Sequence, residues 1–80
     1  MKNSMTNYPQ NIIEKLTKRE IEISILISEG YATKSIALKL GVKSNTVSTI
    51  KRRVFSKLGI NSDIALYKAL KEDNLIVEKT

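Results

Sequence analysis

The chain has 80 residues, a formal net charge of +6 and a pI near 9.7, which favour one small domain with a polyanionic partner. Cysteine and histidine are both absent, which excludes disulfides, thiolate or imidazole metal sites and the usual general base, so we expect no metal, no cofactor and no enzymatic activity. The sequence also lacks an apolar run of the ~20 residues that a membrane span needs and the apolar core of a signal peptide, so we expect a cytoplasmic protein with no membrane partner.

Residues 1–15 are predicted to form a flexible amino-terminal arm. The first ten residues mix small polar residues with the only proline and show no helical or strand period. The segment 11–15 is compatible with a short helical turn that lays apolar side chains on the core. A folded domain is predicted over residues 16–77, and its first helix should begin at the capping box formed by Thr17 and Glu20.

The segment 21–28 fits two kinds of secondary structure. Isoleucine occupies every second position from Ile21 to Ile27, as in a half-buried strand. The capping box before the segment and Glu29-Gly30 after it favour a helix instead. On that helix Ile23, Leu26 and Ile27 share one face, while Ile21 and Ile25 fall roughly opposite. This second pair either packs beneath the amino-terminal arm, which we favour, or contacts a protein partner.

The middle of the chain has the pattern of two helices joined by a tight turn. The first helix is expected from its cap at Thr33 to Leu40, and the second, Ser44–Leu58, from a cap at Ser44 to a stop at Gly59. The turn between them is Gly41-Val42-Lys43. Two helices joined by a short turn with glycine are typical of the helix-turn-helix, whose second helix enters the DNA major groove.

The second of these helices has one apolar and one polar side. Its apolar stripe at helical spacing consists of Val47, Ile50, Val54 and Leu58. The opposite side carries Asn45, Thr49, Arg52 and Ser56, flanked by Ser48 and Arg53 and edged by Lys51 and Lys57. Small polar groups around an arginine suit base edges and phosphates. The same pattern is also typical of the solvated face of an ordinary amphipathic helix.

A last helix is expected from about Ser62, which can cap it, to Asn74. Asp63 in its first turn would interact favourably with the helix dipole. The residues expected to face inward are Leu66, Ala69 and Leu70, followed by Leu75, Ile76 and Val77 along the lower edge of the core. The predicted fold class is therefore all-α, with four helices.

Several short blocks share one family pattern, namely Leu16-Thr-Lys-Arg-Glu20, Gly30, Ile36-Ala37, Leu40-Gly-Val42, Thr46-Val47 and Lys57-Leu-Gly-Ile60. They resemble the LuxR-type helix-turn-helix, also called the NarL or GerE type, over residues 16–76. The block 61–66 is more similar to the Rcs capsule regulators. The resemblance implies a four-helix domain that binds double-stranded DNA as a homodimer and regulates transcription.

Carried over by position, the resemblance implies base contacts by Ser48, Thr49 and Arg52, a phosphate contact by Thr46 and a backbone contact by Lys57. Charge and position add Lys34 and Lys43. The full predicted DNA-binding set is Lys34, Lys43, Asn45, Thr46, Ser48, Thr49, Arg52, Arg53 and Lys57. The resemblance also places the dimer contact on the last helix, whose outer side should offer Ile64, Tyr67 and Lys68.

Four residues depart from the family pattern. Ser48 and Ile50 stand where the family often has lysine and histidine, so the base preference cannot be transferred. Ser24 replaces a usual leucine and should lower the core contribution of its helix. Asp63 replaces a usual arginine, so any salt bridge made by that arginine is absent.

Two functions from different classes remain open. The first is a sequence-specific DNA-binding transcription regulator, either stand-alone or the effector domain of a larger protein. A related regulator or RNA polymerase is a further candidate partner. The alternative is a small helical adaptor that binds a partner regulator. An enzyme is disfavoured, because Glu20 is explained by capping and Glu22 and Glu29 by solvation.

Overall fold

The computed structural model describes residues 11–73 and residue 75, which form helices without any strand. The elements are α1 (Asn11–Lys15), α2 (Lys18–Ser28), α3 (Thr33–Leu40), α4 (Ser44–Leu58) and α5 (Asp63–Glu72). The all-α prediction is confirmed, and the strand interpretation of the isoleucine-rich segment is wrong because that segment lies within α2. The predictions for residues 1–10, Asn74, Ile76 and Val77 lie outside the described residues.

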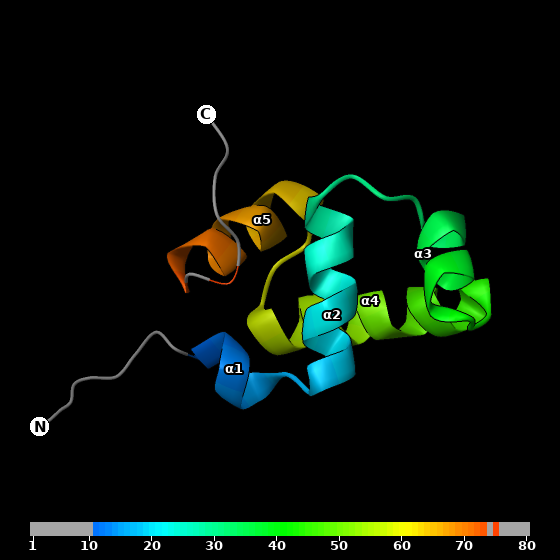
Figure 1. The fold of residues 1–80 in the computed structure, drawn as a ribbon. Helices are drawn as coiled ribbons and strands as arrows, with labels where there is room; N and C mark the ends of the chain where they lie inside the picture. Colours follow the sequence, from blue (N-terminus) through cyan, green and yellow to red (C-terminus); the bar gives the residue numbers. More distant parts are fainter. Residues whose placement is uncertain (1–10, 74, 76–80) are drawn as a thin grey trace, which may run out of the picture.

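Helix α2 occupies the middle of the domain and packs against α3, α4 and α5 (Figure 1). In this view α3 and the first turns of α4 lie to one side of α2, whereas α1 and α5 lie to the other. Helix α4 runs from α3 past α2 and contacts α1. This arrangement separates the helix-turn-helix from the helix on which the dimer contact is predicted.

The core is formed by apolar side chains from all five helices and from the α1–α2 connection. It comprises Ile12, Leu16, Ile23, Ile27, Ile36, Ala37, Val47, Val54, Leu66 and Leu70. Ile21 and Ile25 are half-buried and pack against this core. Their packing beneath the amino-terminal arm stays a prediction. Ser24 is fully buried, and its hydroxyl donates to the Glu20 carbonyl oxygen over 2.7 Å, so its polar group is satisfied.

Helix α1 lies in the segment predicted as the end of the amino-terminal arm. Residues 11–15 form a helix whose Ile12 is buried in the core, as the helical-turn interpretation of this segment predicts, so these five residues belong to the folded domain. The Ile12 amide donates to Asp73 Oδ2 over 3.0 Å. An amide in the first turn of a helix has no intrahelical acceptor, so the Asp73 carboxylate satisfies it and ties α1 to the end of α5.

Two of the four predicted helix caps are correct. Thr17 and Glu20 form the complete capping box of α2, and the Ser62 hydroxyl accepts from the Ala65 amide over 3.1 Å at the start of α5. Thr33 and Ser44 are not caps, because each is already the first helical residue. The extended backbone that a cap requires falls one residue earlier, at Ala32 and Lys43.

The glycine stops of α3 and α4 are as predicted. Gly41 and Gly59 have φ angles of 70° and 68°, in the left-handed region that glycine adopts without a steric penalty. The Val42 amide then donates to the Ala37 carbonyl oxygen over 3.0 Å, which closes the end of α3. The chain therefore changes direction sharply within residues 41–43 and enters α4, as the helix-turn-helix pattern requires.

Candidate nucleic-acid interface

Helix α4 buries its apolar stripe and exposes its polar side. Val47 and Val54 are fully buried, and Ile50 and Leu58 are half-buried against the core. The four residues of the predicted reading face are exposed, namely Asn45, Thr49, Arg52 and Ser56. The side of α4 that faces away from the core is thus composed of small polar groups around Arg52, as predicted.

The cations beside this face differ in whether they are already paired. Among the described residues, Lys34, Lys43, Arg52 and Arg53 are exposed and make no ion pair. Their charges are therefore solvated and available to an anionic ligand. Thr46, the predicted phosphate contact at the start of α4, is exposed as well.

The start of α4 is open to an anion. Lys43 is its N-cap residue, and the Lys43 side chain makes no capping hydrogen bond with the first turn. The amides of a first turn carry the positive end of the helix dipole and can donate to a phosphate oxygen. Lys43 therefore brings a charged side chain to a helix end that also offers backbone donors.

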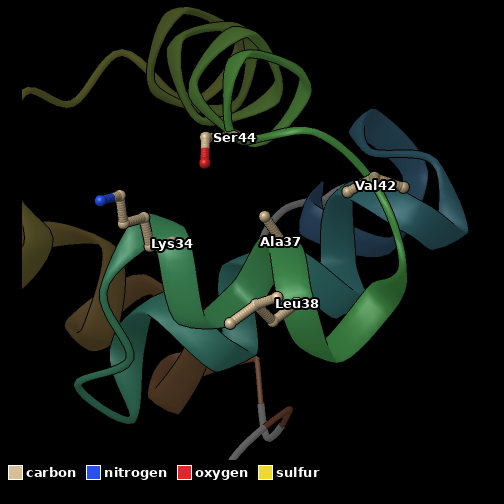
Figure 2. Close-up of a pocket in the computed structure, with 5 residues that line it drawn as sticks. All are labelled: Lys34, Ala37, Leu38, Val42 and Ser44. Carbon is tan, nitrogen blue, oxygen red and sulfur yellow. The ribbon is translucent and has the colours of Figure 1, made fainter.

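A hollow of about 280 Å³ lies between α3 and the start of α4 (Figure 2). Its lining residues are Lys34, Ala37, Leu38, Val42 and Ser44. Figure 2 shows the Lys34 ammonium and the Ser44 hydroxyl on the α4 side of α3, with apolar side chains beyond them. Both polar groups therefore line the hollow, one from the start of α3 and the other from the start of α4. Ser44 had been identified only as a cap, because a helix start is the usual place for serine.

Lys57 does not belong with the free cations. It was predicted to lie near the DNA backbone, but its ammonium is 2.8 and 3.1 Å from the two carboxylate oxygens of Glu20. The Glu20 side chain is only 6% exposed, and its Oε1 also accepts from the Thr17 amide over 2.9 Å. Lys57 thus links the end of α4 to the start of α2. Its contact with the DNA backbone stays a prediction.

This link changes the acidity of Glu20. The hydrogen bond from Lys57 lowers the pKa of Glu20 below the ordinary value of 4.5, against the desolvation that burial imposes. The hydrogen bonds within the capping box act in the same direction as Lys57. Glu20 is therefore held as a carboxylate by the two elements that it joins.

Lys51, at the other edge of the reading face, is also paired. Its ammonium is 3.2 Å from Asp63 Oδ1, in the first turn of α5, and 5.6 Å from the centre of the Phe55 ring. The arginine expected from the family pattern is absent, as noted, but the aspartate in its place forms an ion pair of its own. Nothing local in the sequence signalled this pair, since the two residues belong to different helices.

The predicted dimer contact lies away from the helix-turn-helix. Ile64 is 70% exposed, Lys68 is exposed and Tyr67 is half-buried, whereas Leu66 and Leu70 of the same helix are fully buried. The outer side of α5 therefore presents an apolar side chain to solvent. Its role as a dimer contact stays a prediction.

Residues 11–73 and 75 offer neither a metal-binding cluster nor a membrane-spanning helix. These residues contain no cluster of three or more side chains that could hold a metal ion. None of their helices combines the length and the apolar character needed to cross a membrane.

Two curated regulators are similar to this chain. It is 40% identical over 53 residues to the response regulator GacA of Pseudomonas aeruginosa, a match that covers 66% of this chain and 25% of that protein. It is 45% identical over 62 residues to the oxygen regulatory protein NreC of Staphylococcus aureus, covering 71% of this chain and 29% of that protein. The chain therefore matches between a quarter and a third of the length of these relatives. Neither match bears on the closer placement beside the Rcs regulators.

A family model described as bacterial regulatory proteins, luxR family, matches residues 7–70. The matched region contains the capping box of α2, the glycine turn and the whole of α4. Both the helix order and the residues on the two sides of α4 agree with the family resemblance. This chain belongs to the luxR family of bacterial regulatory proteins.

Proposed function

We propose that this chain is the DNA-binding unit of a transcription regulator and that α4 lies in the major groove. One observation carries this proposal: α4 is buried along its apolar stripe and exposes a polar face with Arg52 at its centre. A helix of this kind can place hydrogen-bonding side chains against base edges. Ser48, Thr49 and Arg52 are the proposed base contacts, and Asn45 lies on the same face.

The phosphate contacts are proposed from the free cations and from the helix end. Lys34 and Lys43 lie at the start of α3 and at the turn, Thr46 lies in the first turn of α4, and Arg53 flanks the reading face. These groups can hold the DNA backbone on either side of the groove and so orient α4. Lys57 would add a contact with the DNA backbone only in competition with Glu20, which already binds its ammonium.

The phosphate assignment predicts a defined salt dependence. Lys34→Ala and Lys43→Ala should each weaken binding to the preferred duplex and to random duplex by similar factors. Each should also reduce the slope of log affinity against log salt by about 0.9, because one fewer phosphate is neutralised. The measurement is a fluorescence titration of labelled duplexes at several salt concentrations.

Lys15→Ala is the matched control, since Lys15 is an exposed lysine of α1, on the other side of α2 from α3 (Figure 1). This variant loses the same charge and should keep the wild-type slope. Slopes that are unchanged in both Lys34→Ala and Lys43→Ala would contradict the phosphate assignment. An apolar protein interface with no salt-dependent DNA binding would favour the adaptor function instead.

We propose further that the chain binds DNA as a homodimer through the outer side of α5. The exposed side chain of Ile64 supports this contact, with Tyr67 and Lys68 beside it. One face of a ten-residue helix provides a small interface, so the dimer should be weak in solution. Two adjacent half-sites would bring two copies together at high effective concentration.

Ile64→Glu tests the dimer contact. Facing carboxylates would repel one another across a two-fold interface, so cooperative binding to paired half-sites should fall roughly tenfold or more. Binding to a single half-site should change much less and serves as the internal control. Gel-shift titrations on duplexes with one and two half-sites measure both quantities. Retained cooperativity in Ile64→Glu would place the contact elsewhere.

A further inference from the structure

The two lysines that edge the reading face of α4 are held in different ways. Lys57 contacts both oxygens of a carboxylate that is 6% exposed and belongs to the capping box of α2. Lys51 makes a single contact of 3.2 Å with Asp63, whose side chain is 58% exposed. A solvated ion pair of this kind is weak and exchanges readily, whereas a buried, multiply bonded pair does not.

The place of Lys51 on α4 makes such an exchange relevant to DNA. Lys51 follows Ser48 by three positions, so their side chains are neighbours on the helix surface. Its ammonium, however, is directed to Asp63 at the start of α5, and its side chain is 34% exposed. Lys51 thus lies at the border of the proposed interface, but its ammonium forms an ion pair with Asp63 of a neighbouring helix.

We propose that Asp63 withholds Lys51 from the DNA backbone and so limits the affinity of this domain for DNA. The Lys51 ammonium has two candidate partners, the Asp63 carboxylate and a DNA phosphate oxygen. Both are anions, so they compete for the same ammonium. While Asp63 holds it, the domain neutralises one phosphate fewer than its exposed face would allow. The inference rests on the proposed DNA-binding function of α4.

Asp63→Asn tests the inference because asparagine keeps the size of the side chain and removes its charge. The released Lys51 should raise the affinity for preferred and random duplex alike by about two- to fivefold at low salt, the range that a weak exposed ion pair allows. The salt slope should become steeper by up to about 0.9, because one more phosphate is neutralised. Circular dichroism of the variant checks that α5 still forms without the carboxylate in its first turn.

Two comparisons separate release of Lys51 from a general gain of positive charge. Glu29→Gln removes one negative charge from an exposed residue without an ion pair in the described part of the chain, so it should affect affinity less and leave the slope unchanged. Lys51→Met keeps an unbranched side chain of similar size but removes the ammonium. In the Lys51→Met background, Asp63→Asn should have no more effect than Glu29→Gln.

Several results would overturn the inference. One is a gain from Asp63→Asn that persists in the Lys51→Met background. Another is a slope of log affinity against log salt that falls as much in Lys51→Met as in Lys43→Ala. Lys51 would then already contact a phosphate in the wild-type protein. An Asp63→Asn variant that binds like Glu29→Gln or more weakly also contradicts it. If no variant and no wild-type protein bound any duplex, the proposed function would fail together with the inference.

Discussion

Lys57→Met is expected to lower the free energy of unfolding by about 1–3 kcal/mol, because it leaves a buried carboxylate without its charged partner. The Glu20 side chain is 6% exposed, so water cannot replace the lost ammonium. In a domain of this size the thermal midpoint should fall by about 5–15 °C. Thermal unfolding followed by circular dichroism measures the change.

Glu20→Gln provides the reciprocal test of the same link. The Lys57 side chain is 39% exposed, so the ammonium that loses its partner returns to water at little cost. The destabilisation by Glu20→Gln should therefore be smaller than that by Lys57→Met. Arg52→Ala is the control for the removal of a positive charge from α4. Arg52 is exposed and has no ion pair in the described part of the chain, so the thermal midpoint of this variant should stay near that of the wild type. A midpoint for Lys57→Met that also equals wild type would contradict the structural role of Lys57.

The same link predicts a pH dependence of stability. The folded-state pKa of Glu20 lies below 4.5, the ordinary value that we take for the unfolded chain. The unfolded state therefore binds a proton more readily, so the stabilisation by the carboxylate is fully present above pH 4.5 and is lost as the pH falls towards the lowered pKa. Glu20→Gln should lack this part of the acid-induced loss. Midpoints of wild type and Glu20→Gln that fall in parallel with pH would contradict it.

Arg52→Ala is expected to reduce the preference for the cognate duplex over random duplex by about tenfold or more, as a lost bidentate guanine contact costs about 1–3 kcal/mol of discrimination. Arg52 is exposed at the centre of the polar face of α4 and is the only residue there with a long forked cation. Ser48 and Thr49 have a shorter reach and can supply only single hydrogen bonds or a methyl contact. The quantity to measure is the ratio of specific to non-specific affinity at one fixed salt concentration.

Arg53→Ala is the matched control for this experiment. Arg53 is the same residue type on the same helix, but it flanks the reading face and is proposed to contact phosphate. Its loss should weaken binding to cognate and random duplex by the same factor, because phosphate contacts carry no sequence information. If Arg52→Ala behaved in this way too, Arg52 would be a phosphate contact and would not read the sequence.

The sequence alone determined the helices and the two sides of α4. The stop at Gly59, the capping box of Thr17 and Glu20 and the apolar stripe of α4 all depend on residues within a few positions of one another. Such patterns reflect helical periodicity and local hydrogen bonding, and both can be inferred from residues that are close in the sequence. The end predicted for α4, Leu58 followed by Gly59, is accordingly that of the structure, whereas its start lies one residue before the predicted one.

Local patterns were less able to locate the caps of α3 and α4. A threonine and a serine at the expected starts suggested caps, but the extended residues are Ala32 and Lys43, which cannot cap with their side chains. Where the backbone first becomes helical depends on how each helix follows the connection before it and packs on α2. The shift leaves the start of α4 without a side-chain cap, which is where a phosphate contact is proposed.

Only the tertiary structure decided which cations are free. Lys51 and Lys57 look equivalent at the two edges of the α4 reading face, yet they pair with Asp63 of α5 and Glu20 of α2. The Ile12 amide likewise meets Asp73, 61 residues along the chain. These contacts arise because α2 and α5 pack where they do, and helix packing is set by the shapes of the buried faces, which charge spacing along the sequence does not encode.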